Sequence, residues 1–175
     1  MQASGPIVIA GFMGCGKTAV ASALAVHLNC KMVDLDEAIT EREARTPARI
    51  IEEDGESAFR AIETITLHDV LRDGSVGIVA LGGGAWITGT SRKLISQYAR
   101  LTVWLDTPFD VCWKRINLSD AVRPLGRSEE EARELYERRC PVYALADFRL
   151  EADEGVSLDE LALKIEDQVA HPGLP

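Results

Sequence analysis

The sequence lacks an excess of positive charge: 19 Lys and Arg residues face 28 Asp and Glu, a formal net charge of −9. Nucleic-acid-binding and basic membrane-surface proteins need a cationic face to meet phosphates. No apolar run approaches the ~18 residues of a membrane span, and the N-terminus has no basic segment followed by an apolar one. We therefore expect no nucleic-acid partner and no membrane association.

The cysteines lack the spacing of a metal-binding site or of a C-x-x-C motif, and nothing indicates a disulfide-rich protein. The four cysteines form no C-x-x-C pair and show no metal-ligand spacing: Cys15, Cys30, Cys112 and Cys140. A chain of 175 residues, 46% hydrophobic and 27% charged, does not need disulfides to hold its core. We expect a single globular domain over residues 1–175, with reduced thiols, in the cytoplasm.

Short apolar runs typical of buried strands alternate with stretches of helical periodicity. Val20, Leu24 and Leu28, for example, form one stripe of a helix that starts at Lys17. The alternation predicts an α/β fold, a parallel sheet of about five strands sandwiched by helices, with ligands at the carboxyl ends of the strands. The expected strands are residues 6–10, 31–33, 75–81, 100–105 and 148–151. Helices are expected over 38–53, where Pro47 can start a new helix, over 56–71, and over 158–169. One helix is also expected after the third strand and one after the fourth. A further helix is expected from Ser128, which forms a capping box with Glu131.

A phosphate-binding loop is the strongest single motif. Gly11-Phe-Met-Gly-Cys-Gly-Lys-Thr18 matches G-x-x-x-x-G-K-[ST] between a predicted strand and a predicted helix. Backbone N–H groups there surround phosphate oxygens, Lys17 neutralises phosphate charge, and the Thr18 hydroxyl ligates Mg²⁺. The motif predicts ATP and Mg²⁺ as cofactors, with the nucleotide held by Gly14, Cys15, Gly16, Lys17, Thr18 and Ala19.

Two carboxylates follow the second strand, in Asp34-Leu-Asp36. Strand alternation would point both toward the active-site end. One could hold hydrated Mg²⁺ while the other takes a hydroxyl proton from an acceptor. The alternative is that they cap the next helix.

Other P-loop classes lack their markers here. There is no Asn-Lys-x-Asp guanine motif, and no acidic pair follows the strand that ends at Leu81, where many motor ATPases carry their metal-binding carboxylates. Gly82-Gly83-Gly84 follows instead and permits close approach of a small molecule to the backbone. Six arginines between Arg115 and Arg139 form a candidate anion site, although a solvated helix face is the alternative.

Six ordered motifs from residue 11 to residue 143 resemble the shikimate kinase family. Besides the P-loop they are Asp34-Leu-Asp36, Phe59-Arg60 with Glu63, Gly82-Gly83-Gly84, Arg123-Pro124-Leu125 and Arg139-Cys-Pro-Val-Tyr143. The resemblance implies a phosphotransferase with an alcohol acceptor, which uses ATP and Mg²⁺ to phosphorylate the 3-hydroxyl of shikimate in aromatic amino acid biosynthesis. It also implies a substrate-binding segment at about 34–63 and a mobile lid at about 117–127. Compact kinases of this size are often monomeric, so we expect a monomer.

The resemblance also assigns roles at matching positions. Lys17, Asp36 and Arg123 are implied to be catalytic, with Asp36 at the reacting hydroxyl and Arg123 as the lid arginine that reaches the phosphates. Arg115 is expected to stack on adenine, and Asp34 belongs to the water shell of the metal. The substrate-binding residues are implied to be Asp36, Arg60, Gly82, Gly83, Gly84 and Arg139, with both arginines on the substrate carboxylate.

Several alternatives stay open at this level. Arg60 and Glu63 could be an ordinary i, i+3 surface pair, and Arg139 could be solvated. The enzyme could instead be a gluconate or nucleoside monophosphate kinase, or the chain could be a regulatory module that binds ATP and metabolite without turnover. Paired arginines beside a glycine trio favour a carboxylated cyclic substrate over the first two, because a guanidinium fork binds a carboxylate bidentately.

Overall fold

The computed structural model describes residues 5–118 and 128–171. Five strands form one parallel sheet in the order β2-β3-β1-β4-β5. The strands are β1 (Ile7–Ala10), β2 (Lys31–Asp34), β3 (Val76–Ala80), β4 (Leu101–Asp106) and β5 (Phe148–Glu151). The predicted doubly wound sheet of about five strands is therefore confirmed.

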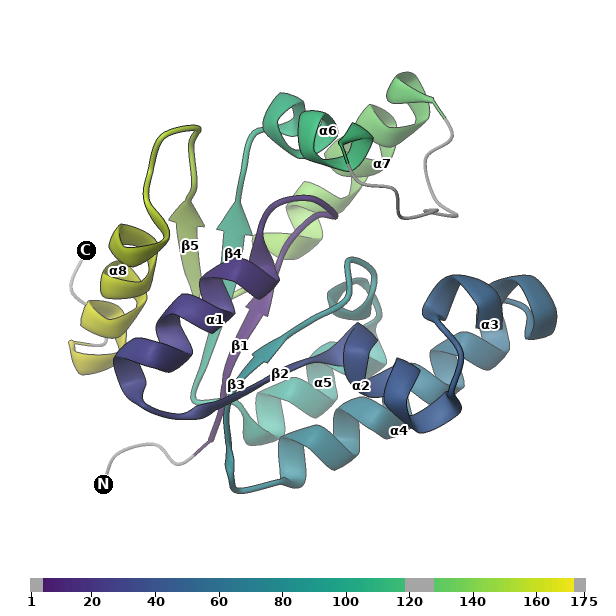
Figure 1. The fold of residues 1–175 in the computed structure, drawn as a ribbon, viewed down its shortest axis with the longest axis horizontal. Coiled ribbons are helices and arrows are strands. Elements are labelled where there is room, and N and C mark those ends of the chain that lie inside the picture. The colour runs from purple at the N-terminus through teal and green to yellow at the C-terminus, as the bar shows by residue number, and fades with distance from the viewer. Residues whose placement is uncertain (1–4, 119–127, 172–175) are drawn as a thin grey trace.

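Helices cover both faces of the sheet (Figure 1). Helices α1 (Lys17–Leu28) and α8 (Leu158–Ala170) pack together on one face. The other face carries α4 (Glu56–Arg72) and α5 (Gly89–Tyr98), while α2 (Leu35–Glu43) and α3 (Pro47–Asp54) precede α4. The short 3₁₀ helix η1 (Ala85–Ile87) follows β3, and α6 (Phe109–Asn117) and α7 (Glu129–Tyr143) lie between β4 and β5 in the chain. In the described part of the chain, no helix is both long and apolar enough to cross a membrane.

The strand order reverses its direction of winding between β1 and β3. The chain leaves β1 toward β2 on one side and leaves β3 toward β4 on the other, so the direction of winding reverses between these neighbouring strands. Ligands of open α/β sheets bind at such a reversal, beyond the carboxyl ends of the strands. The loops that follow β1 and β3 are the phosphate loop and the glycine trio, Gly82–Gly84, and a Cβ built on Gly83 would lie 3.5 Å from the Met13 nitrogen. The fold brings the two motifs into contact.

Local signals explain where most helices begin. Ser128 and Glu131 form the expected capping box of α7, and Thr46 caps α3 with Pro47 in its first turn. The predicted start at residue 38 is wrong for α2, which begins at Leu35 directly after β2. The reason is that the Asp34 side chain accepts hydrogen bonds from the Asp36 and Glu37 N–H groups and so starts the helix three residues earlier.

The central strand supplies a stability test. Ile9 on β1 is fully buried between β3 and β4, so Ile9→Ala removes packed methylene groups and leaves a cavity. We expect the free energy of unfolding to fall by about 2–5 kcal/mol, measured by urea denaturation. Val26→Ala, on the exposed face of α1 at 80% exposure, is the control and should change stability by no more than about 0.5 kcal/mol. Equal effects of the two substitutions would contradict the assignment of β1 to the core.

Candidate active site

The phosphate loop wraps around the side chain of its own lysine. Lys17 Nζ donates to the carbonyl oxygens of Gly11, at 3.0 Å, and Phe12, at 2.9 Å. Gly14 has φ of 75°, and a Cβ there would come within 2.7 Å of the Cys112 carbonyl oxygen. Only glycine fits such a position without strain. The loop thus carries an ammonium group at its centre, next to the first turn of α1, where backbone N–H groups and the helix dipole favour anions.

The side chains of Thr18 and Asp34 meet beside this loop. Thr18 Oγ1 donates to Asp34 Oδ2 at 2.5 Å, and Asp34 Oδ1 accepts from the Asp36 N–H at 2.9 Å. Asp34 therefore caps α2 and also faces the start of α1, so the two interpretations of this carboxylate are compatible. Mg²⁺ prefers hard oxygen ligands and is usually held by one or two side chains together with waters and substrate phosphates. This hydroxyl and carboxylate fit such an ion.

Asp36 lies in the first turn of α2, not on the strand. Its orientation therefore cannot come from strand alternation, and that part of the prediction is wrong. The helix start instead brings the carboxylate against the turn after β3, where a Cβ built on Gly82 would lie 2.5 Å from Asp36 Oδ1. The absence of a side chain at Gly82 is what lets the carboxylate reach this backbone.

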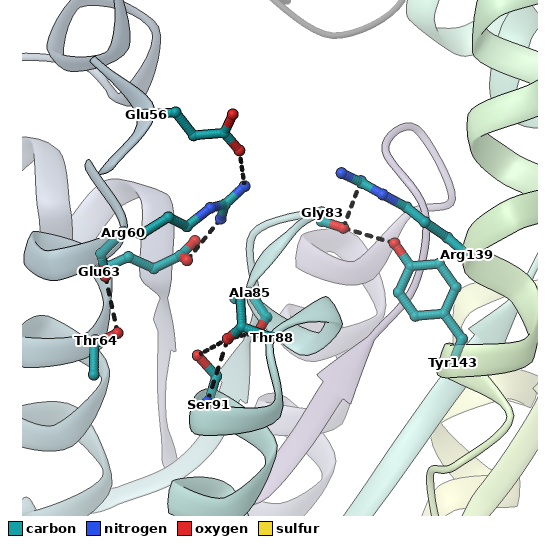
Figure 2. A network of polar contacts seen from close by, with 10 residues as sticks. All are labelled: Glu56, Arg60, Glu63, Thr64, Gly83, Ala85, Thr88, Ser91, Arg139 and Tyr143. Atoms are coloured by element: carbon teal, nitrogen blue, oxygen red, sulfur yellow. Dashed lines mark hydrogen bonds and ion pairs between the residues drawn. The ribbon is translucent and has the colours of Figure 1, made fainter. Parts of the chain in front are cut away.

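Arg60 enters the same space from α4. Its NH1 donates to Glu63 Oε2 at 2.7 Å, and its NH2 donates to Glu56 Oε1 at 3.4 Å (Figure 2). Glu63 is 1% exposed, so the surface-pair alternative is wrong. Burial raises the pKa of Glu63, and the attraction of Arg60 opposes this only in part. Burial would by itself lower the pKa of Arg60, but the carboxylates of Glu63 and Glu56 together outweigh it, so the pKa of Arg60 is raised.

Arg139 reaches the glycine trio from the opposite side, on α7. Figure 2 shows its guanidinium and the Tyr143 hydroxyl converging on the Gly83 carbonyl oxygen, at 3.0 and 2.6 Å. Arg139 is 8% exposed, which rules out the solvated alternative. A Cβ built on Gly84 would come within 2.6 Å of Arg60 NH2. The glycine turn therefore lies between two arginines that come from different helices.

Of the two arginines that are expected to contact the nucleotide, the structure describes Arg115 but not Arg123. Arg115 NH1 donates to the Cys15 carbonyl oxygen at 3.1 Å and lies 3.4 Å from that of Gly14, which places its side chain beside the phosphate loop. Stacking of Arg115 on adenine stays a prediction. Arg123 lies outside the described residues, as does most of the expected lid at 117–127.

Two side chains of this site were not predicted as binding residues, although both occur in the quoted motifs. Glu63 is three residues from Arg60, and Tyr143 is four residues from Arg139. On a helix these spacings place both members of each pair on one face. That spacing is the available signal. Only the fold shows that Glu63 is buried beside Arg60 and that Tyr143 contacts the glycine turn.

Comparisons with known proteins agree with this geometry. The family model described as shikimate kinase matches residues 13–170. A shikimate kinase of Cereibacter sphaeroides is 41% identical over 167 residues, covering 94% of this chain and 82% of the relative. One from Streptococcus thermophilus is 36% identical over 150 residues, covering 83% and 90%.

Solved structures give the same result. The shikimate kinase of Acinetobacter baumannii, solved in complex with shikimate, superposes with a TM-score of 0.89 at 30% identity and covers 99% of this chain and 97% of that one. A gluconokinase of Sinorhizobium meliloti, at 16% identity and a TM-score of 0.63, with coverage of 97% and 94%, shares the fold. With the family model matched along nearly the whole chain, this protein belongs to the shikimate kinase family.

Proposed function

We propose that this enzyme transfers the γ-phosphoryl group of ATP to the 3-hydroxyl of shikimate, giving shikimate 3-phosphate and ADP. The observation that carries the proposal is the convergence of Arg60, Arg139 and Asp36 on one glycine turn beside the phosphate loop. Two guanidinium groups on opposite sides of the turn suit a carboxylate, and Asp36 suits a hydroxyl.

Each side chain then has a distinct part in the reaction. Lys17 neutralises charge on the β- and γ-phosphates, and the first turn of α1 orients them. Asp36 orients the acceptor hydroxyl and takes its proton. Thr18 and Asp34 would hold Mg²⁺, Asp34 through bound water, and the ion would then supply neutralisation of phosphate charge. Phosphoryl transfer needs mainly positioning and electrostatic stabilisation, which this set provides.

The proposal extends to parts of the chain whose roles rest on the resemblance. Residues 34–63, which include α2 and α3, would form the substrate-binding segment, and residues 117–127 would form a lid whose Arg123 reaches the phosphates. We also propose a cytoplasmic monomer that binds no nucleic acid. The net charge of −9 supports the absence of a nucleic-acid partner, and the four free cysteines support a reducing compartment. The monomer is proposed from the small size of the chain. Light scattering after size-exclusion chromatography tests the monomer, and a dimer mass would overturn it.

A coupled ADP-release assay with shikimate, gluconate and AMP tests the substrate. Shikimate alone should support turnover that requires both ATP and Mg²⁺. Turnover with gluconate or AMP in its place would identify another small-metabolite kinase, and nucleotide binding with no turnover on any of them would identify a regulatory module.

Lys17→Met should remove most turnover, because the Lys17 ammonium lies within the phosphate loop, bonded to the Gly11 and Phe12 carbonyl oxygens, where it can meet phosphate charge. We expect kcat to fall by roughly 10²-fold or more, as for loss of a donor that meets transition-state charge. Since Lys17 also bonds two loop carbonyls in the free protein, its melting temperature is measured alongside. Normal turnover in the folded variant would contradict the role.

Asp36→Asn keeps the shape of the side chain but loses the charge that takes the hydroxyl proton. We expect kcat to fall by roughly 10² or more, with the KM for ATP nearly unchanged. Asp34→Asn is the companion variant and should mainly raise the Mg²⁺ concentration needed for half-maximal rate. If the two results are reversed, the roles of the two carboxylates are exchanged.

Arg60→Lys should raise the KM for shikimate by roughly tenfold, since the charge survives but the planar fork does not. Initial rates across a range of shikimate concentrations measure this. Arg149→Lys is the control, because Arg149 forms an ion pair with Asp106 and its side chain is 59% exposed. An unchanged KM in Arg60→Lys would remove Arg60 from the substrate site.

A further inference from the structure

Tyr143 is a buried residue that the reaction scheme above does not use. It is the last residue of α7, one helical turn beyond Arg139, and is 1% exposed. Its hydroxyl donates to the Gly83 carbonyl oxygen at 2.6 Å, the same atom that Arg139 NH1 reaches at 3.0 Å. Burial raises the pKa of Tyr143 well above its usual range, so the hydroxyl stays protonated and remains a donor.

The bond to Gly83 fixes more than one carbonyl group. The Gly83 C=O and the Gly84 N–H belong to the same planar trans peptide and point in opposite directions. Because the carbonyl points toward α7, the Gly84 N–H points away from α7, and Figure 2 shows Arg60 across the turn from that helix. No hydrogen bond from this N–H to another described residue is present. The donor is therefore available to a ligand that lies against the turn.

A run of three glycines needs an external constraint to hold one conformation, because glycine populates more backbone conformations than any other residue. Tyr143 is well placed to supply it. The ring of Tyr143 stacks against Trp104 of β4, with centroids 6.4 Å apart. A second hydrogen bond joins α7 to the segment that follows the glycine turn: Trp86 Nε1, on η1, donates to the Val142 carbonyl oxygen at 2.8 Å.

We propose that Tyr143 is a positioning residue for the acceptor substrate, which holds the Gly83–Gly84 peptide with its N–H turned toward the substrate. The inference rests on the proposed function, since the ligand it serves is the anionic acceptor between Arg60 and Arg139. When the substrate carboxylate engages the Arg139 guanidinium, Tyr143 keeps the Gly83 carbonyl bonded, so the turn does not reorganise. No residue of the phosphate loop takes part in the hydrogen bond between Tyr143 and Gly83.

Tyr143→Phe removes only the hydroxyl and tests the proposal directly. We expect the KM for shikimate to rise about three- to tenfold, the scale of one lost hydrogen bond, with kcat and the KM for ATP nearly unchanged. Tyr136→Phe is the matched control, because it removes the same atom from a tyrosine of the same helix. The Tyr136 hydroxyl donates to the Thr107 carbonyl oxygen, at 3.1 Å, and not to the glycine turn. The control should leave the KM for shikimate unchanged.

Hydrogen exchange of the peptide that spans residues 82–87, measured without substrate, gives a reading independent of turnover. Exchange should accelerate in Tyr143→Phe and not in Tyr136→Phe. Trp86→Phe removes the indole donor to Val142. Like Tyr143→Phe, it should accelerate exchange and raise the KM for shikimate. If the wild-type enzyme does not phosphorylate shikimate but exchange accelerates as expected, the proposed function fails and the positioning of the turn stands. Unchanged exchange with an unchanged KM, or equal increases in the KM for ATP and shikimate, overturns the inference.

Discussion

The site depends on a backbone turn without side chains at the end of β3. Asp36 from α2, Arg60 from α4 and Arg139 from α7 all approach this turn, and a Cβ at Gly82 or Gly84 would meet the first two at 2.5 and 2.6 Å. Any larger residue would therefore separate the charged groups that must act on one small molecule. The sheet order places the turn beside the phosphate loop, because winding reverses between β1 and β3. Sheet topology thus sets the distance between donor and acceptor sites.

Burying these charges is possible because they balance. Around the turn, the cations Arg60 and Arg139 are balanced by Asp36 and Glu63. Arg60 forms ion pairs with Glu63 and Glu56, and Glu63 is the more buried of these two acids. An unpaired buried charge would cost several kcal/mol, so Glu63 stabilises Arg60 before a substrate binds. Glu63 also limits how Arg60 can move, since the 2.7 Å contact fixes one edge of the guanidinium. Among the described residues, the remaining NH2 group hydrogen-bonds only to the exposed Glu56, at 3.4 Å, and is the part best placed to exchange partners.

The sequence was informative wherever a physical rule acts locally. The glycine spacing of the phosphate loop, the Ser128 capping box and Pro47 at a helix start depend on a few neighbouring residues, and all were predicted. The position of Asp36 does not follow from the pattern, because strand and helix meet at Asp34 and periodicity cannot locate such a boundary. The burial of Glu63 and the bond from Tyr143 to Gly83 depend on how α4 and α7 pack on the sheet. That packing brings together segments that are far apart in the chain. Pattern alone could place those residues on a helix face but not say what the face contacts.

The net charge of −9 does not oppose binding of two anionic ligands, because the charges act over different ranges. Exposed carboxylates more than about 8–10 Å from a ligand are largely screened at physiological ionic strength. Charges inside the site are screened much less, and three of its cations, Lys17, Arg60 and Arg139, are partly or largely withdrawn from solvent. The local field is therefore set by a few residues at the carboxyl edge of the sheet.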